Sequence, residues 1–286
     1  MDHKRTLSLM TLFLPRENIF FIEEWLKFHI AIGFNHFYLY NNMGSRWIDW
    51  GNNIKVNNKN KRGESIYALL ADKTDAEVQE AFDEILKPFV KKGYVTQVMW
   101  QPKDEFGNIT YAQEDAFIDY IKNYSGKSDW VCFTDLDEFI FPLTYDNIQD
   151  FIDGLDKNGY TYVNMAQKCF ASRFTENNKP VKKVLEIYNC SDKIISGFGM
   201  KTIIRTDTLR LPLKNEEYNI HAPEVYGARS KYFYNPDIIR FNHYKFNKKE
   251  LNWVRNTYNV EFRLNMTDKK IIHYYSRIKH LACLIN

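Results

Sequence analysis

The chain has 286 residues, of which 44% are hydrophobic, 16% aromatic and 26% charged. This composition is that of a globular protein with a sizeable core, in one large domain or one domain with a C-terminal annex, and it excludes an intrinsically disordered chain. The formal net charge of +3 gives no indication of nucleic-acid binding.

The first residues alternate between predicted strands and helices. Leu7 to Leu14 is a short apolar run that ends at Pro15, as expected of a buried strand. Apolar residues at helical spacing follow from Glu17 to Ile32, and Gly33 is a typical helix stop. The segment from His36 to Asn42 is a second strand. These residues therefore predict a βαβ unit and a parallel sheet.

The same alternation continues after a polar segment. Arg46 to Arg62 is rich in Asn, Lys and Gly and lacks periodicity, which indicates a loop or an insertion. The next predicted elements are a helix over 75–92, a strand over 94–100, a helix over 111–124 and a wholly apolar, central strand over 130–134.

The alternation breaks in the second half, which we predict to be mixed. Its predicted elements are a helix over 146–157, strands over 160–166, 181–189, 200–206 and 238–244, and closing helices over 248–257 and 269–284. From Arg240 onward, ten Lys or Arg accompany only three Asp or Glu, with Trp253, Tyr258, Tyr274 and Tyr275 among them. Such a tail suits an anionic membrane surface or an anionic ligand, and it equally fits the solvated faces of helices.

The sequence contains no pattern typical of a membrane span or a cysteine zinc site. The four cysteines lie far apart without a C-x-x-C pair. No apolar run reaches about 18 residues, and the N-terminal apolar run has no small-residue cleavage site. We therefore expect a cytoplasmic protein, with peripheral contact at the inner membrane face as the only form of membrane association.

Three carboxylates interrupt the apolar stretch W-V-C-F-T-D-L-D-E-F-I-F-P, which begins at Trp130. They are Asp135, Asp137 and Glu138, and they directly follow the predicted central strand. Ligands of open α/β sheets bind beyond the carboxyl ends of the strands, and a buried charge needs a partner or a metal ion. Carboxylates at i and i+2 suit Mg²⁺ or Mn²⁺, which can hold a diphosphate as it leaves. A turn that carries solvated acids is the alternative.

Several motifs accompany D-L-D-E-F. The front block contains E-W-L-x-x-H, which ends at His29, and G-x-x-H-F-Y-L-Y, which begins at Gly33. A pair His243-Tyr244 precedes a predicted helix that carries Lys248 and Glu250, and the stretches M-K-T-I-I-R-T-D and N-I-H-A-P-E lie upstream of it. Together these motifs resemble the GT-A glycosyltransferases of family 92 and their family 2-like bacterial relatives, over nearly the whole chain.

The chain departs from the pattern of that family in three places. R-E stands where N-E is usual, and Y-N-N replaces Y-D-N, so that Asn41 takes the place of a nucleotide-facing acid. A serine- and glycine-rich acceptor motif is reduced to C-F-A-S-R-F, from Cys169 to Phe174. These departures concern the sugar donor and the acceptor more than the fold.

The resemblance implies an α/β protein with the GT-A fold, a Rossmann-like mixed central sheet flanked by helices. It implies a catalytic domain over 1–245, with a nucleotide-sugar-binding half (1–142) and an acceptor half (143–245), and then a basic helical segment over 246–286. The implied activity is that of an inverting, metal-dependent glycosyltransferase (a hexosyltransferase). It would move sugar from a nucleotide sugar, such as a UDP-sugar, to a glycan or lipid-linked acceptor in bacterial surface-polysaccharide or lipooligosaccharide synthesis.

The resemblance also implies roles for individual residues in the donor site. Asp135 and Asp137 would hold Mn²⁺ or Mg²⁺ on the diphosphate, with His243 as a third ligand or, alternatively, as a hydrogen-bonded core residue. Glu138 would orient the site or pair with a core arginine. The residues expected to face the base and ribose are Leu14, Pro15, Arg16, Glu17, Asn41 and Asn42, with a surface position as the alternative for Arg16.

The roles expected of other residues are less specific. Lys201, Arg205 and Lys245 would neutralise phosphate charge or lie on the solvated surface. An inverting transfer needs a base, and the candidates are Glu224, His221 and Glu186, with Glu224 preferred because it lies in a Pro/Gly-flanked loop. The residues expected to be structural, because they fall within strongly apolar patterns, are Trp25, His29 and His36.

Two other functions compete with glycosyl transfer. A metal-dependent nucleotidyltransferase or phosphohydrolase would also use paired aspartates, and it would hydrolyse or transfer nucleotide without a sugar acceptor. A non-catalytic carbohydrate-binding module would use the aromatic side chains as platforms and would need no metal site. The front block argues against both.

Overall fold

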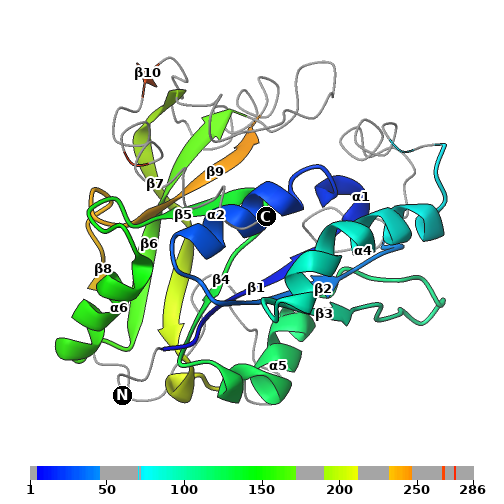
Figure 1. Ribbon diagram of the computed structural model, residues 1–286, viewed down its shortest axis with the longest axis horizontal. Coiled ribbons are helices and arrows are strands. Elements are labelled where there is room, and N and C mark those ends of the chain that lie inside the picture. Colours follow the sequence, from blue (N-terminus) through cyan, green and yellow to red (C-terminus); the bar gives the residue numbers. More distant parts are fainter. Residues whose placement is uncertain are drawn as a thin grey trace.

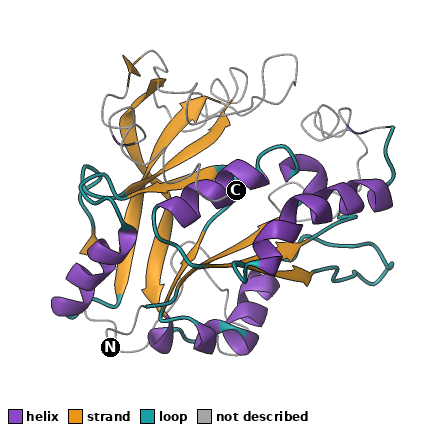
Figure 2. Cartoon of the chain, in the orientation of Figure 1, coloured by secondary structure: helices purple, strands orange, loops and turns teal. Residues whose placement is uncertain are grey.

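A computed structural model describes residues 5–45, 70, 72–171, 190–211, 232–246, 266–267 and 274 of the chain. These residues form one mixed sheet with helices packed against it (Figures 1 and 2). The described helices are α1 (Pro15–Asn18), α2 (Ile22–Ala31), α4 (Asp75–Lys91), α5 (Gln113–Asn123) and α6 (Ile148–Lys157), with short 3-10 turns at Ser125–Lys127 and Thr206–Thr208.

The sheet has the strand order β3-β2-β1-β4-β7-β6-β9-β5, and β8 and β10 pair with β6 and β7. The strands are β1 (Leu7–Phe13), β2 (His36–Asn41), β3 (Val95–Met99), β4 (Trp130–Phe133), β5 (Glu138–Phe141), β6 (Tyr162–Ala171), β7 (Cys190–Arg205), β8 (Tyr232–Phe233), β9 (Arg240–Phe246) and β10 (Met266–Thr267).

The strands up to β4 form a parallel part of the sheet, and the later strands form a mixed part in which β6 also pairs in parallel with β8 and β9. β1, β2, β3 and β4 pair in parallel, whereas β7 pairs antiparallel with β4 and β6, and β5 pairs antiparallel with β9. β4 lies between β1 and β7, and all four of its residues are buried. The prediction of an α/β protein with a mixed sheet and a central strand at Trp130 is therefore confirmed.

Several elements differ from the sequence prediction. The helix predicted over 17–32 is two helices, because the Asn18 side chain accepts a hydrogen bond from the Leu14 amide and closes α1 as a single turn. The helix predicted over 111–124 begins at Gln113, after Ala112 adopts a left-handed conformation. The strand β5 was not predicted. The strand at 181–189, the loop at 46–62 and the two closing helices lie outside the described residues, apart from Tyr274.

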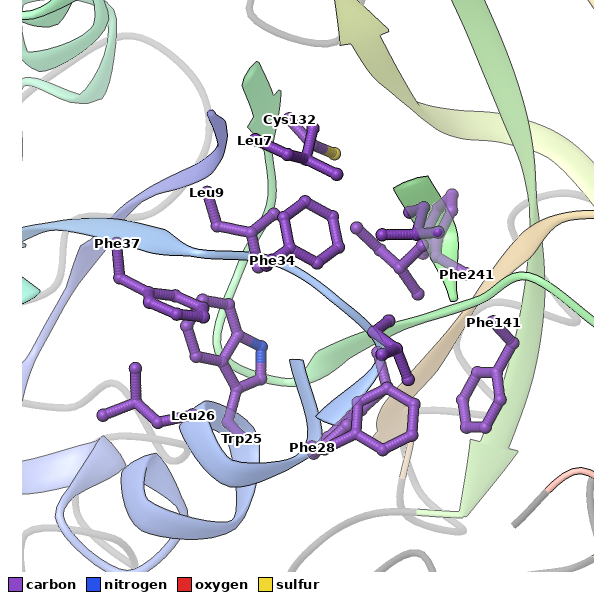
Figure 3. Close-up of a cluster of buried hydrophobic side chains, with 14 of the residues drawn as sticks. Leu7, Leu9, Trp25, Leu26, Phe28, Phe34, Phe37, Cys132, Phe141 and Phe241 are labelled. Atoms are coloured by element: carbon purple, nitrogen blue, oxygen red, sulfur yellow. The ribbon is translucent and has the colours of Figure 1, made fainter. Parts of the chain in front are cut away.

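Both faces of the sheet are buried, as alternating residues of β1 show. Leu7, Leu9 and Phe13 belong to a cluster that includes side chains of α2, α4 and α6. Met10 and Leu12 belong to a second cluster, which includes α5. Figure 3 shows Trp25, Leu26 and Phe28 of α2 in the first cluster, beside residues of β1, β2, β5 and β9. A strand that is buried on both faces is apolar along nearly its whole length. The sequences of β1 and β4 are therefore nearly continuous apolar runs.

The terminal strand β5 is held along one edge by two side chains of α2. The Trp25 Nε1–H donates to the carbonyl oxygen of Glu138 at 2.9 Å. The His29 Nε2 atom accepts from the Ile140 amide at 3.2 Å. Residues four apart on a helix are separated by about 6 Å along its axis, and residues two apart on a strand by nearly 7 Å. The spacing of Trp25 and His29 therefore matches the backbone groups that an edge strand would otherwise leave unpaired.

These contacts fix the tautomer of His29. Its Nδ1 atom lies 2.8 Å from the Trp25 carbonyl oxygen and must donate, because a carbonyl cannot. Its Nε2 atom must then accept, in keeping with the Ile140 contact. The side chain is fully buried, and burial lowers the pKa of His29 from 6.5 to about 3 despite the carbonyl contact. His29 is therefore a neutral, structural residue, as predicted, and Trp25 is a core residue.

We predict that His29 stays neutral well below its ordinary pKa. The unfolded chain binds this proton near pH 6.5 and the folded chain only near pH 3. The contribution of His29 to stability is therefore complete above pH 6.5 and is lost as the pH falls toward 3. Nitrogen-15 NMR should show the Nδ1–H tautomer down to about pH 4.5, whereas the urea-unfolded protein should titrate near its ordinary value. A midpoint near the ordinary value in the folded protein would contradict this assignment.

Gly33 follows α2 and contacts the start of α6, at a position that only glycine can occupy without a collision. Its φ of +108° is in the region that favours glycine, and an added Cβ would collide with the side-chain amide of Asn147. Asn147 caps α6 by accepting from the Gln149 amide at 2.8 Å, and the Gln149 side chain donates to the Gly33 carbonyl oxygen at 2.9 Å. The start of α6 therefore depends on the missing side chain of Gly33.

We predict that Gly33→Ala destabilises the protein by roughly 2–4 kcal/mol, because it combines backbone strain with loss of a helix cap. Thermal unfolding should show a fall of several degrees in Tm. Gly126→Ala is the matched control, since its Cβ would meet no atom within 4 Å and its φ is not positive. Equal Tm values for the two variants would contradict this account of the α2–α6 junction.

Candidate active site

Asp135 and Asp137 of D-L-D-E lie in the turn between β4 and β5, and Glu138 is the first residue of β5. The turn is closed by Glu138, whose Oε2 atom accepts from the Asp135 amide at 2.8 Å and from the Thr134 hydroxyl at 3.0 Å. Glu138 is buried, and its own amide donates to the Asp135 carbonyl oxygen at 3.1 Å. Glu138 therefore shapes the turn that carries the two aspartates.

The buried lysine of β7 forms ion pairs with two of these carboxylates. The Nζ atom of Lys201 lies 2.9 Å from Asp135 Oδ2 and 3.0 Å from Glu138 Oε2, and its side chain is 5% exposed. Burial alone would lower the pKa of Lys201, but the two carboxylates outweigh it and hold the pKa above its ordinary value. Burial raises the pKa of Glu138, and Lys201 opposes that rise. Glu138 thus pairs with a lysine, where a core arginine was one expectation.

The other oxygen of Asp135 also has a partner. The side-chain amide of Gln113, the first residue of α5, donates to Asp135 Oδ1 at 3.4 Å. Asp135 is therefore held by Gln113 on one oxygen and by Lys201 on the other, and its carboxylate is about one-third exposed. This arrangement fixes the orientation of Asp135 through groups from two separate elements.

Asp137 faces His243 of β9. The Asp137 Oδ2 and His243 Nε2 atoms lie 3.3 Å apart, and both side chains are largely buried. The register of the sheet places them together: Glu138 is opposite His243, and the Tyr244 amide donates to the Asp137 carbonyl oxygen at 2.8 Å. The structure therefore brings the predicted ligands Asp137 and His243 together from residues more than 100 positions apart in the sequence.

The remaining nitrogen of His243 contacts the side-chain amide of Gln167 in β6. A metal-binding histidine usually donates its second N–H to an oxygen. The oxygen and nitrogen of a Gln amide can exchange places by a flip of the group. With its oxygen toward Nδ1, Gln167 would accept that proton and leave Nε2 able to bind a cation beside Asp137.

The pair Asp137–His243 fits a divalent cation, although a full protein cage is absent from the described part of the chain. Among those residues, no group of three His, Cys, Asp or Glu side chains is placed to hold a metal ion. Oxygen and imidazole ligands suit Mn²⁺. Mg²⁺ is commonly held by one or two carboxylates, with substrate phosphates and water completing its shell. Two protein ligands at the edge of the sheet are therefore sufficient for a metal that binds together with a diphosphate.

The predicted donor residues at the end of β1 lie in and near α1, which directly follows it. Pro15 occupies the first turn of α1 and is buried. Glu17 contributes, with the carboxylates of the β4–β5 turn, to the electrostatic field at the hydroxyl of Tyr111. The end of β1 and the carboxylate turn therefore meet around Tyr111, a residue that the sequence analysis did not single out.

The Arg16 side chain forms its hydrogen bonds with residues at and before the start of α4. Its three nitrogens donate to Asp75 Oδ1 at 2.7 Å, to the Leu70 carbonyl at 3.0 Å and to the Lys73 carbonyl at 2.8 Å. These bonds tie α1 to the start of α4, where Thr74 and Glu77 form a capping box. Arg16 is therefore a structural residue in this arrangement, and we leave it out of the proposed donor site.

Asn41 and Asn42 lie buried at the carboxyl end of β2. Asn41 donates to Gln79 of α4 at 2.8 Å and accepts from the Met43 amide at 3.0 Å. Asn42 donates to the carbonyl oxygens of Trp100 and Thr110 at 2.7 and 3.0 Å, whereas its own buried side-chain oxygen has no hydrogen-bond partner among the residues that the structure describes. Both residues organise the loops at the ligand edge of the sheet.

Other predicted residues lie apart from this cluster or outside the described chain. Arg205 pairs with Asp207 and lies opposite Trp130, at the far end of β4 from Asp135. Lys245 lies in β9, but its side chain is not described. Tyr274, which was grouped with the basic tail, is buried against Phe141. The candidates that lie outside the described residues are Glu224, His221 and Glu186, together with most of the segment 246–286.

No helix in the described ranges is both long and apolar enough to cross a membrane.

Three side chains of the cluster were not predicted from the sequence: Tyr111, Gln113 and Gln167. The first two fell within a predicted helix, and Gln167 just beyond a predicted strand. Their only sequence signal is that polar groups stand at the ends of elements next to the carboxyl edge of the sheet.

Comparison with known proteins gives distant structural matches. S. aureus TarS is 13% identical, over 70% of this chain and 28% of that one, with a TM-score of 0.31. Glucosyl-3-phosphoglycerate synthase from Mycobacterium tuberculosis, in complex with Mn²⁺, UDP and glucosyl-3-phosphoglycerate, is 11% identical over 71% of this chain, with a TM-score of 0.28. The match spans 57% of that synthase, so this chain accounts for less than two thirds of either protein. At these TM-scores the likeness carries no argument about function.

The curated proteins contain no match to this chain. The profile of glycosyltransferase family 92, in contrast, matches residues 74–280. This region is well over half of the chain and includes the D-L-D-E turn, Lys201 and His243. It agrees with the mixed α/β sheet and with the GT-A fold that the front block and D-L-D-E-F indicated. The chain belongs to glycosyltransferase family 92.

Proposed function

We propose that the chain is a metal-dependent glycosyltransferase that uses a nucleotide-diphosphate sugar, with a UDP-sugar as the first candidate. The observation that carries the proposal is the pair Asp137–His243 at the carboxyl edge of the sheet, in a member of a glycosyltransferase family. A carboxylate and an imidazole this close, with a neutralised carboxylate cluster beside them, suit a cation that binds with a diphosphate.

Asp137 and His243 would hold Mn²⁺ or Mg²⁺, and the ion would neutralise charge on the leaving diphosphate. Gln167 orients His243, and Glu138 sets the turn that presents Asp137. Asp135, although predicted as a ligand, has Gln113 and Lys201 on its two oxygens. We therefore assign Asp135 the role of positioning Lys201, whose charge lies near the site of the diphosphate and would favour its departure.

The nucleoside would lie along the carboxyl ends of β1 and β2, beside Glu17, Asn41 and Asn42, because this edge adjoins the metal ligands. The acceptor would be a glycan or a lipid-linked glycan of bacterial surface-polysaccharide or lipooligosaccharide synthesis, and transfer would invert the anomeric centre. Glu224 is the first candidate for the base, followed by His221. A cytoplasmic enzyme with a basic C-terminal segment at the inner membrane face would meet such an acceptor.

We predict that one nucleotide sugar raises the Tm of the protein only when Mn²⁺ is present. Ligand at about 100 times its Kd stabilises by about 2.7 kcal/mol, which corresponds to a shift of roughly 5 °C or more. Asp137→Asn should abolish the shift, because it removes the carboxylate that faces His243. Differential scanning fluorimetry with a panel of nucleotide sugars measures this.

Asp150→Asn is the matched control, because Asp150 is exposed on α6, outside the cluster. It should keep the full metal-dependent shift. Binding of Mn²⁺ with no nucleotide sugar, or rapid hydrolysis of free nucleotide without an acceptor, would replace glycosyl transfer by the nucleotidyltransferase or phosphohydrolase alternative. Sugar binding that persists in Asp137→Asn without metal would favour a carbohydrate-binding module.

We predict that Lys201→Met destabilises the protein by about 3–5 kcal/mol at neutral pH, because it leaves buried carboxylates without their cation. Without Lys201 the pKa of Glu138 rises further, so the folded state takes up a proton more readily than the unfolded state. The loss should therefore shrink as the pH falls toward 5, which urea unfolding at two pH values measures. Lys87→Met, at a side chain that is 69% exposed, is the control. A Lys201→Met variant as stable as the wild type would contradict the buried ion pairs.

A further inference from the structure

The start of α5 carries a strained residue beside the proposed donor site. Ala112 has φ 41° and ψ 55°, and within the described ranges it is the one non-glycine residue with positive φ. Such a conformation is strained for a residue with a Cβ atom and persists where surrounding contacts impose it. Here the Ala112 carbonyl oxygen accepts from the Trp100 indole at 3.3 Å and from the Ala116 amide at 3.2 Å.

The two neighbours of Ala112 both reach the carboxylate cluster. Gln113 donates to Asp135, as described above. The Tyr111 hydroxyl lies 3.5 Å from the Leu12 carbonyl oxygen, near the end of β1. It also lies in the field of Asp135, Glu17, Asp137 and Glu138. The polar side chains on either side of Ala112 therefore serve one site: Gln113 contacts Asp135, and the Tyr111 hydroxyl contacts β1 within the field of the carboxylates.

Within the described part of the chain, the hydroxyl of Tyr111 is a hydrogen-bond donor without a good acceptor. Burial and the four neighbouring carboxylates raise its pKa well above the ordinary value, so it keeps its proton. Its one hydrogen-bond contact among the described residues is the carbonyl at 3.5 Å, which is the outer limit of such a bond. The side chain is half-buried, so a ligand could still reach it.

We propose that Tyr111 binds the nucleoside diphosphate part of the donor: its hydroxyl donates to a diphosphate oxygen, while its ring stays packed on the apolar cluster that includes Met10 and Leu12. The geometry supports this because the hydroxyl contacts Leu12 near the end of β1 and lies in the field of Asp137, the proposed metal ligand. The proposal rests on the proposed function. It adds a donor-binding residue just before α5, in place of Arg16.

The test is isothermal titration of UDP, in the presence of Mn²⁺, into the wild type and Tyr111→Phe. The variant keeps the ring and loses only the hydroxyl. A hydrogen bond to a charged group contributes about 1.5–3 kcal/mol, so the Kd for UDP should rise roughly 10-fold or more. Electron paramagnetic resonance should show unchanged Mn²⁺ binding in the absence of nucleotide, because Tyr111 is not a ligand of the ion.

Tyr124→Phe is the matched control. Tyr124 directly follows α5 at its other end, where its ring contacts Tyr38 and Tyr40, and loss of its hydroxyl should leave the Kd unchanged. Equal UDP affinity of Tyr111→Phe and the wild type would overturn this inference while leaving the proposed function intact. A parallel loss of Mn²⁺ binding would also overturn it. If the wild type binds no nucleoside diphosphate, the proposed function fails, and this inference fails with it.

Discussion

The site depends on two hydrogen bonds that hold one edge of β5 against α2. Trp25 and His29 bind the carbonyl of Glu138 and the amide of Ile140, and no other helix supplies such bonds to β5 in the described structure. Glu138 is also the residue whose carboxylate closes the turn at Asp135. The motifs E-W-L-x-x-H and D-L-D-E-F, which lie more than 100 residues apart, are therefore one structural unit. The first motif fixes the backbone of the second, and the backbone places Asp137.

The acidic side chains of the site differ in the partner that balances their charge. Lys201 lies between Asp135 and Glu138, so these two acids can be buried without a metal ion. Asp137 faces His243, whose Nε2 atom could bind a cation. The site is thus stable as a fold and still complementary to a divalent cation, which explains why three carboxylates stand in an apolar stretch.

The sequence was sufficient to predict elements whose pattern is local. The strand at Leu7, the helix at Asp75 and the central strand at Trp130 are each defined by apolar periodicity and a clear stop. The strand β5 could not be predicted, because E-F-I-F is short, follows a turn and begins with a buried acid whose partners are distant. Arg16 resembled a ligand-binding residue because it follows β1, yet its partners lie near Asp75. Lys201 was expected near the phosphates, and no local pattern indicated that its partner Asp135 lies 66 positions earlier.

The types of residue in the site were easier to predict from the sequence than their arrangement in space. The pair Asp137–His243 came from a family resemblance, and its proximity follows from the antiparallel register of β5 and β9, which no local pattern specifies. Tyr111 and Gln113 were hidden because helical periodicity continues through Ala112, where the backbone in fact turns left-handed. Local patterns give the elements, but the contacts between distant edges decide which side chains share the site.

The most direct test of this account is a crystal structure with Mn²⁺ and UDP, with anomalous diffraction used to locate the metal. The account predicts one anomalous peak within about 2–2.5 Å of both an Asp137 oxygen and His243 Nε2, with the diphosphate completing the shell. It also predicts that Lys201 still contacts Asp135. A metal held by other side chains, or a diphosphate bound away from the β4–β5 turn, would contradict the central claim.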